Sequence, residues 1–144
     1  MPLASEKWVK AVLSCRPKIL KSLSDETLAS LNFAAVMAQL LGPQYRESEW
    51  LPEDLELGLS MKTSSAVTMF EFCARHYDQL NVYAGAGINR LKIDVSTSTE
   101  RGYRACSACE SLRGSIWTTE TIPELPHEKC INKLGCRCLA LAGI

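Results

Sequence analysis

The residues with the clearest chemical meaning are cysteines near the C-terminal end of this chain of 144 residues. Five cysteines and one histidine fall between positions 106 and 138, namely Cys106, Cys109, His127, Cys130, Cys136 and Cys138. Thiolates bind borderline metal ions tightly, and a Cys-x-x-Cys turn directs two sulfurs at one ion. The pattern therefore predicts a tetrahedral metal site, and the cofactor we expect there is Zn²⁺.

These candidates compete for the four ligand positions of a structural zinc site. The Cys-x-x-Cys turn supplies one pair. For the second pair, Cys136 is the first choice, followed by Cys138 and Cys130 and then by His127. The spacing leaves this choice open, and the side chains left over are expected to pack or to support the ligands.

Other interpretations of the cysteines are weaker. One alternative is that the cysteines bind no metal and form buried thiols or a disulfide, but five cysteines would then have gathered in a short stretch by chance. Another is a thioredoxin-like redox pair, which would require a βαβ unit that the sequence does not show. Catalysis would require an open metal position and a base such as Glu110, Glu124 or Glu128, whereas sites rich in cysteine are closed. The only other histidine, His76, is expected at the surface or half-buried on a helix.

The bulk composition narrows the classes of function. Net charge is zero, with 16 basic and 16 acidic residues, which argues against a generic nucleic-acid binder. No apolar run reaches the length of about 18 residues that a membrane span needs, and the start lacks a signal-peptide pattern. We therefore expect a cytoplasmic or virion-associated protein with reduced cysteines, in which Cys15 and Cys73 lie buried on apolar helical faces away from the cluster.

Helical patterns dominate the first part of the chain. We expect helices over residues 3–14, from Pro17, from Ser24 to Leu41, from Pro52, and from Ser64 or Ser65 to Tyr83. Glycines at positions 85 and 87 mark the boundary between a helical region, 1–85, and a cysteine-rich zinc-binding β module, 86–144. Trp8, Trp50 and Tyr83 are expected to hold the helices together or to the sheet.

Strand patterns follow the glycine-rich boundary. Apolar and polar residues alternate from Leu91 to Val95, which predicts a half-buried strand. Ile116-Trp117 predicts a second strand, in which core packing is favoured over exposure for the tryptophan, and residues 136–141 predict a closing strand. The predicted fold class is α+β, with an N-terminal helical bundle followed by a small zinc-stabilised antiparallel sheet.

The order of these motifs resembles the C-terminal zinc-binding segment of phage Mu F-like minor head (head morphogenesis) proteins. The resemblance covers residues 86–142. It rests on Ile93-Asp94-Val95, Cys106-Ser-Ala-Cys109, Leu112-Arg-Gly114, Ile116-Trp117, Leu125-Pro126-His127 and Gly135-Cys136-Arg-Cys138. It implies a zinc module in a phage or prophage head-associated component, with head or portal proteins as partners.

The sequence thus favours a non-enzymatic zinc-binding structural or interaction protein with a protein partner and no membrane. One alternative is a nucleic-acid-binding zinc protein. Its contact patch would comprise Arg101, Arg104, Arg113, Lys129, Lys133 and Arg137. A further alternative is a small metal-dependent effector enzyme. An open coordination position would favour the enzyme, and binding that weakens steeply with salt would favour the nucleic-acid interpretation.

Overall fold

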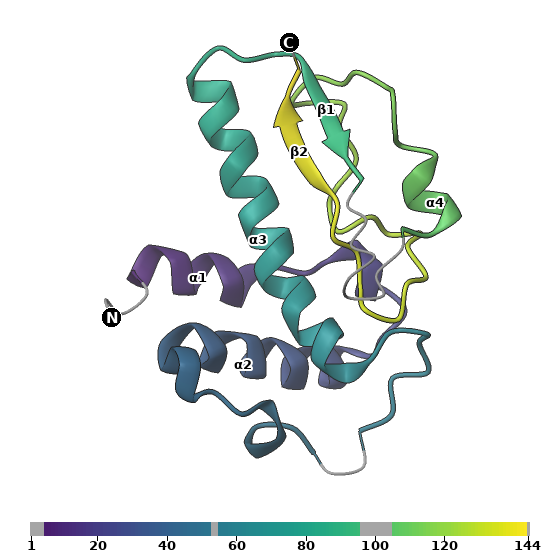
Figure 1. Cartoon of the computed structure of the whole chain (residues 1–144). Coiled ribbons are helices and arrows are strands. Elements are labelled where there is room, and N and C mark those ends of the chain that lie inside the picture. Colours follow the sequence, from purple (N-terminus) through teal and green to yellow (C-terminus); the bar gives the residue numbers. More distant parts are fainter. Residues whose placement is uncertain (1–4, 53–54, 96–104, 144) are drawn as a thin grey trace.

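The structure is a computed structural model that describes residues 5–52, 55–95 and 105–143. Within these ranges the longer helices precede the two strands, and the short helix α4 (Ser107–Glu110) lies between the strands along the chain, so the predicted α+β class is confirmed. Helix α3 (Thr63–Gly85) contacts both parts. Helices α1 (Glu6–Ser14) and α2 (Asp25–Leu41) pack against it, and the sheet lies beside its C-terminal half (Figure 1).

Serine side chains begin both N-terminal helices. The Ser5 hydroxyl accepts a hydrogen bond from the Trp8 N–H at 3.1 Å, and the Ser24 hydroxyl accepts one from the Thr27 N–H at 3.2 Å. Each bond satisfies an N–H group of the first turn, which has no partner within the helix. Helix α2 ends at Gly42, whose φ of 59° suits glycine, so the predicted limits of this helix are confirmed.

Polar side chains fix α1 on α2. The Trp8 indole N–H donates to the Gln39 side-chain oxygen at 2.8 Å, so this tryptophan joins two helices as predicted. Buried Asn32 donates its side-chain N–H to the Val12 carbonyl oxygen at 2.9 Å. A buried amide is stable in a core only when it is hydrogen-bonded in this way.

The connections between helices contain short 3-10 turns. They are η1 (Lys18–Leu20), η2 (Gly42–Gln44) and η3 (Glu47–Glu49). The helix predicted from Pro17 is limited to η1, because Ser24 caps the next helix soon afterwards. The Trp50 ring meets the ring of Phe33 on α2 edge-on, with centroids 5.9 Å apart, so Trp50 also packs onto a helix.

The helix predicted from Pro52 is wrong, because the described residues 55–62 contain no helix. Leu55, Leu57 and Leu59 are half-buried there, and the residues between them are exposed. This alternation is the period of an extended chain, which turns every second side chain toward the core. The leucines therefore bury their side chains without a helix.

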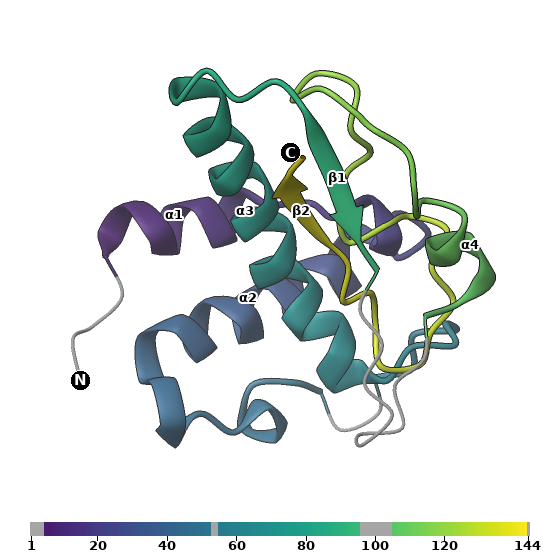
Figure 2. The ribbon, with the colours of Figure 1, turned by 45° about the horizontal axis from the view of Figure 1, so that its top comes forward.

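The sheet consists of two antiparallel strands, β1 (Leu91–Asp94) and β2 (Leu139–Ala142), in which Ile93 pairs with Ala140. The strand predicted at Ile116-Trp117 is reduced to a single bridge between Trp117 and Leu91, and Trp117 is half-buried. The Tyr83 hydroxyl donates to the Ala140 carbonyl at 3.2 Å and so joins α3 to β2. Strand β2 lies between α3 and β1 (Figure 1 and Figure 2).

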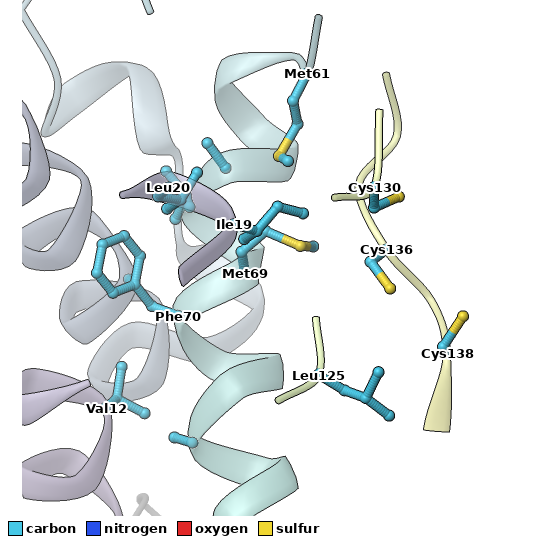
Figure 3. Packing of buried hydrophobic residues seen from close by; sticks show 14 of the residues in the cluster. Val12, Ile19, Leu20, Met61, Met69, Phe70, Leu125, Cys130, Cys136 and Cys138 are labelled. Carbon is cyan, nitrogen blue, oxygen red and sulfur yellow. The ribbon is translucent and has the colours of Figure 1, made fainter. Parts of the chain in front are cut away.

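One buried cluster includes side chains from both ends of the chain. Phe70 and Leu20 occupy its helical side, whereas Cys130 and Cys136 line the C-terminal side. Met69 extends from α3 between the two groups (Figure 3). The division into a helical region (1–85) and a cysteine-rich module (86–144) stays a prediction, and the core is continuous across it.

Candidate metal centre

A single helical turn brings the first two cysteines together. Helix α4 (Ser107–Glu110) begins directly after Cys106, and the Glu110 N–H donates to the Cys106 carbonyl oxygen at 2.9 Å. This turn places Cys109 fully inside the core, whereas Cys106 is half-buried. The Cys-x-x-Cys segment therefore brings its two sulfurs within 4.8 Å of each other.

The remaining cysteines come from a segment with two consecutive turns. The Cys130 N–H donates to the His127 carbonyl oxygen at 3.0 Å, and the Gly135 N–H donates to the Asn132 carbonyl oxygen at 2.9 Å. Gly135 has a φ of 80°, a conformation that favours glycine, and it directs the chain into Cys136. A Cβ at Gly135 would lie 2.6 Å from the Met69 methyl carbon, so α3 packs directly under this turn.

The five cysteine sulfurs form two groups that can each hold a metal ion. Cys106, Cys109 and Cys130 make one group, and Cys109, Cys136 and Cys138 make the other; within each, the sulfurs lie within 4.8 Å of one another. Cys109 belongs to both. The structure thus brings together all five cysteines that the sequence predicted as metal ligands.

Two sulfur pairs have the separation that a tetrahedral zinc site requires. Cys106 Sγ lies 3.7 Å from Cys130 Sγ, and Cys109 Sγ lies 3.8 Å from Cys136 Sγ. Bonds of about 2.3 Å from zinc to sulfur place the ligand atoms of a tetrahedron about 3.8 Å apart. These two pairs use four different sulfurs and share Cys109 between the two groups, but the four sulfurs do not all lie within 4.8 Å of one another, so a single ion bound by all four would have to draw the two pairs closer together.

His127 contributes its backbone to this centre. The His127 N–H donates to Cys136 Sγ at 3.3 Å, whereas its imidazole belongs to neither group of metal-ligating atoms in the described chain. Its Nδ1 is buried without a hydrogen-bond partner among the described residues. An N–H bond to a ligand sulfur stabilises the thiolate, and the backbone of His127 therefore has the supporting role expected of a group next to a ligand.

Neighbouring thiols shift each other's pKa values. Hydrogen bonds from Cys109 and then Cys130 and Cys138 hold the pKa of Cys136 far below its usual range. The pKa of Cys130 is raised well above its usual range by its interactions with Cys109 and Cys136 and by burial. A thiolate stabilised by neighbouring thiols in this way would attract a cation.

The carboxylates near the centre are all used in other contacts. Glu110 pairs with Arg113, and this hydrogen bond lowers the pKa of the carboxyl group. Glu124 accepts hydrogen bonds from the Tyr77 hydroxyl and, at 2.7 Å, from the Lys18 backbone N–H. A third carboxylate, Glu128, pairs with Lys21. None of the three is presented to the sulfur groups as a free base.

Some of the basic residues that were predicted to contact nucleic acid make other contacts within the protein. Arg113 is ion-paired with Glu110, and the Arg137 guanidinium lies 5.1 Å from the ring centroid of Phe72. Lys129 and Lys133 are exposed. Arg101 and Arg104 lie outside the described residues.

Two residues, His76 and Cys15, differ from the burial that the sequence predicted. Nothing in the sequence indicated that Cys15 lies near Cys73. His76 was expected at the surface or half-buried, but only 6% of it is exposed, and burial lowers its pKa; it lines one cavity together with Leu125 and Pro126. Cys73 is buried as predicted, whereas Cys15 is half-buried because it is the residue that ends α1. Cys15 and Cys73 also lie together, which their separation in sequence gave no sign of.

Comparison with protein-family models, curated proteins and solved structures finds no match to this chain. The resemblance to Mu F-like minor head proteins therefore stays a prediction that rests on motif order. Among the described residues, no helix has both the length and the apolar character needed to cross a membrane.

Proposed function

We propose that this protein binds one zinc ion in a closed structural site that stabilises its C-terminal part. The observation that carries the proposal is the pair of sulfur separations, 3.7 and 3.8 Å, between four buried or half-buried cysteines. Both distances match the edge of about 3.8 Å of a zinc tetrahedron. When bound, the ion supplies cross-links between segments rather than reaction chemistry.

The proposed ligands are Cys106, Cys109, Cys130 and Cys136. Each belongs to one of the two pairs at tetrahedral separation, and Cys136 also accepts the N–H of His127. Cys138 is the remaining cysteine of the two sulfur groups, and it directly precedes β2. We assign it to packing beside the site.

The second part of the proposal is a non-enzymatic role in contacts with another protein. Four sulfur ligands leave zinc without an open position for substrate or water. Large apolar side chains are exposed on the metal-bearing segment, with Ile116 52%, Ile131 68% and Leu139 50% exposed. Where exposed apolar side chains lie together as one patch, they mark a site for a protein partner, and this is the role we propose for them. Motif order supports the narrower proposal of a phage or prophage head-associated component with a head or portal protein as partner.

Two measurements test these parts separately. Elemental analysis and zinc K-edge X-ray absorption of the protein, purified under reducing conditions, should give about one zinc per chain with sulfur-only coordination. A bound water or a vacant ligand position would contradict the closed site. Portal and terminase genes beside the coding gene would support the head-associated role, and unrelated neighbours would count against that role while leaving the zinc site intact.

A further inference from the structure

Two cysteines outside the metal centre share a hollow between the N-terminal helices. Cys15 ends α1, and Cys73 lies in the middle of α3. Both are free thiols and both line a cavity of about 430 Å³, together with Tyr77 and Glu124. Cys73 is fully buried, whereas Cys15 is half-buried and therefore reachable by a small molecule in the cavity.

The two thiols shift each other's pKa values. The neighbouring Cys73 thiol lowers the pKa of Cys15. The same interaction and burial raise the pKa of Cys73 well above its usual range. A thiolate is the reactive form of cysteine, and the half-buried Cys15 is the member of the pair that a small molecule reaches, whereas Cys73 is fully buried.

We propose that Cys15 and Cys73 form a peroxide-sensitive thiol pair that closes to a disulfide between the end of α1 and α3. The Cys15 thiolate attacks one oxygen of a hydroperoxide, which forms an S–O bond and breaks the O–O bond. The leaving hydroxide or alkoxide takes up a proton. The sulfur of Cys73 then attacks the sulfenic sulfur, the S–S bond forms, and the hydroxyl leaves as water with the proton of Cys73.

Glu124 is positioned to assist the second step. Its carboxylate interacts with the Cys73 thiol, and the Tyr77 hydroxyl and the Lys18 N–H hold it in place. A fixed carboxylate beside the resolving thiol can take up its proton as the S–S bond forms and pass that proton to the departing hydroxyl, which leaves as water. The pair thus has the parts of a reactive thiol, a resolving thiol and a base within one cavity.

This inference is independent of the proposed zinc function. Zinc-bound thiolates are held in a closed site, whereas Cys15 and Cys73 line a cavity to which none of the proposed ligands contributes and belong to neither sulfur group. Oxidation of the pair should therefore precede loss of zinc. It would change how α1 is held on α3 without opening the metal centre.

The test treats the zinc-loaded full chain with one equivalent of hydrogen peroxide and follows its intact mass and its bound zinc. We expect a mass loss of about 2 Da, one Cys15–Cys73 peptide in a non-reducing digest, full reversal by dithiothreitol, and retained zinc. Disulfides among Cys106, Cys109, Cys130, Cys136 and Cys138, formed while Cys15 and Cys73 still react with an alkylating agent, would overturn the proposal.

Two single variants separate the roles of the thiols. In Cys73→Ser, the Cys15 sulfenic acid should accumulate and be trapped by dimedone. In Cys15→Ser, which alters only a half-buried side chain, Cys73 should stay a free thiol at the same peroxide dose. Equal oxidation of Cys73 in Cys15→Ser would overturn the assigned order of attack, and the double variant should show no mass change.

Discussion

Cys109 Sγ and Cys136 Sγ lie 3.8 Å apart, although 27 positions separate the two residues along the chain. The first belongs to the short helix α4, and the second follows the turn at Gly135. Few elements of regular structure lie between them. A shared metal ion is the interaction that would hold these two segments at this distance.

Substitution of single cysteines should identify the ligand set. Cys136→Ser removes a proposed ligand and should lower zinc affinity by more than the about 10–100-fold typical of changes to supporting residues. Cys138→Ser, its neighbour in the same segment, should keep about one zinc per chain, because four sulfur ligands remain. A competition titration with a chromophoric chelator measures both affinities. If Cys138→Ser loses zinc and Cys106→Ser retains it, Cys138 rather than Cys106 is the fourth ligand.

His127→Ala should leave the zinc stoichiometry unchanged. The variant keeps the backbone N–H that Cys136 Sγ accepts, and the imidazole lies outside both sulfur groups. Its effect on affinity should be smaller than the about ten-fold loss seen for important supporting groups. Cys130→Ser serves as the positive control in the same titration. A nitrogen ligand in the X-ray absorption spectrum that disappears in His127→Ala would show that the imidazole binds the metal.

Gly135→Ala should weaken the metal centre through its contact with α3. A Cβ there would meet the Met69 methyl carbon at 2.6 Å, and the φ of 80° is unfavourable for alanine. Gly114→Ala is a matched control, because Gly114 also has a positive φ, 86°, but a Cβ added there would meet nothing within 4 Å. The control should cost about 1–2 kcal/mol of stability and keep its zinc affinity.

For Gly135→Ala we expect a similar backbone cost and, in addition, a loss of zinc affinity of about ten-fold or more, because Cys136 is displaced with the turn. Denaturant unfolding and chelator competition on both variants give the two quantities. Equal zinc affinities for the two alanine variants would show that the contact with Met69 does not position Cys136.

Phe70→Ala should destabilise the whole fold by about 3–5 kcal/mol, the usual cost of removing a fully buried phenylalanine. The cluster around Phe70 is continuous with the cysteine side of the core, so the loss should appear in one transition. Phe33→Ala is the control, because that ring is 50% exposed and its removal leaves no cavity in the core. Two separate unfolding transitions would instead support independent helical and cysteine-rich domains.

Much of the helical architecture was predictable because local signals specify it. Ser24 with its hydroxyl cap and Gly42 with its positive φ define α2 in sequence and in structure. The segment after Pro52 shows the limit of this reasoning. Its leucines alternate with exposed residues, so burial against the core favours an extended chain over the helix that the proline and acidic residues indicated.

The candidate site was predictable in composition and only partly in geometry. Cysteine density identified the five sulfurs, but the pairing of Cys106 with Cys130 and of Cys109 with Cys136 depends on the path of two loops. The support of the Cys136 turn by Met69 depends on tertiary packing in the same way. The proximity of Cys15 and Cys73 results from the contact of α1 with α3, and no local pattern encodes that contact.

The most direct test of the metal-bound fold is a two-dimensional NMR spectrum of the amide groups, recorded under reducing conditions before and after a chelator removes the metal. The zinc-bound chain should contain about one zinc per chain, and signals from residues 105–143 should lose their dispersion on chelation and regain it when zinc is added back. A purified chain that is free of metal and shows dispersed signals through Ala142 would contradict the account.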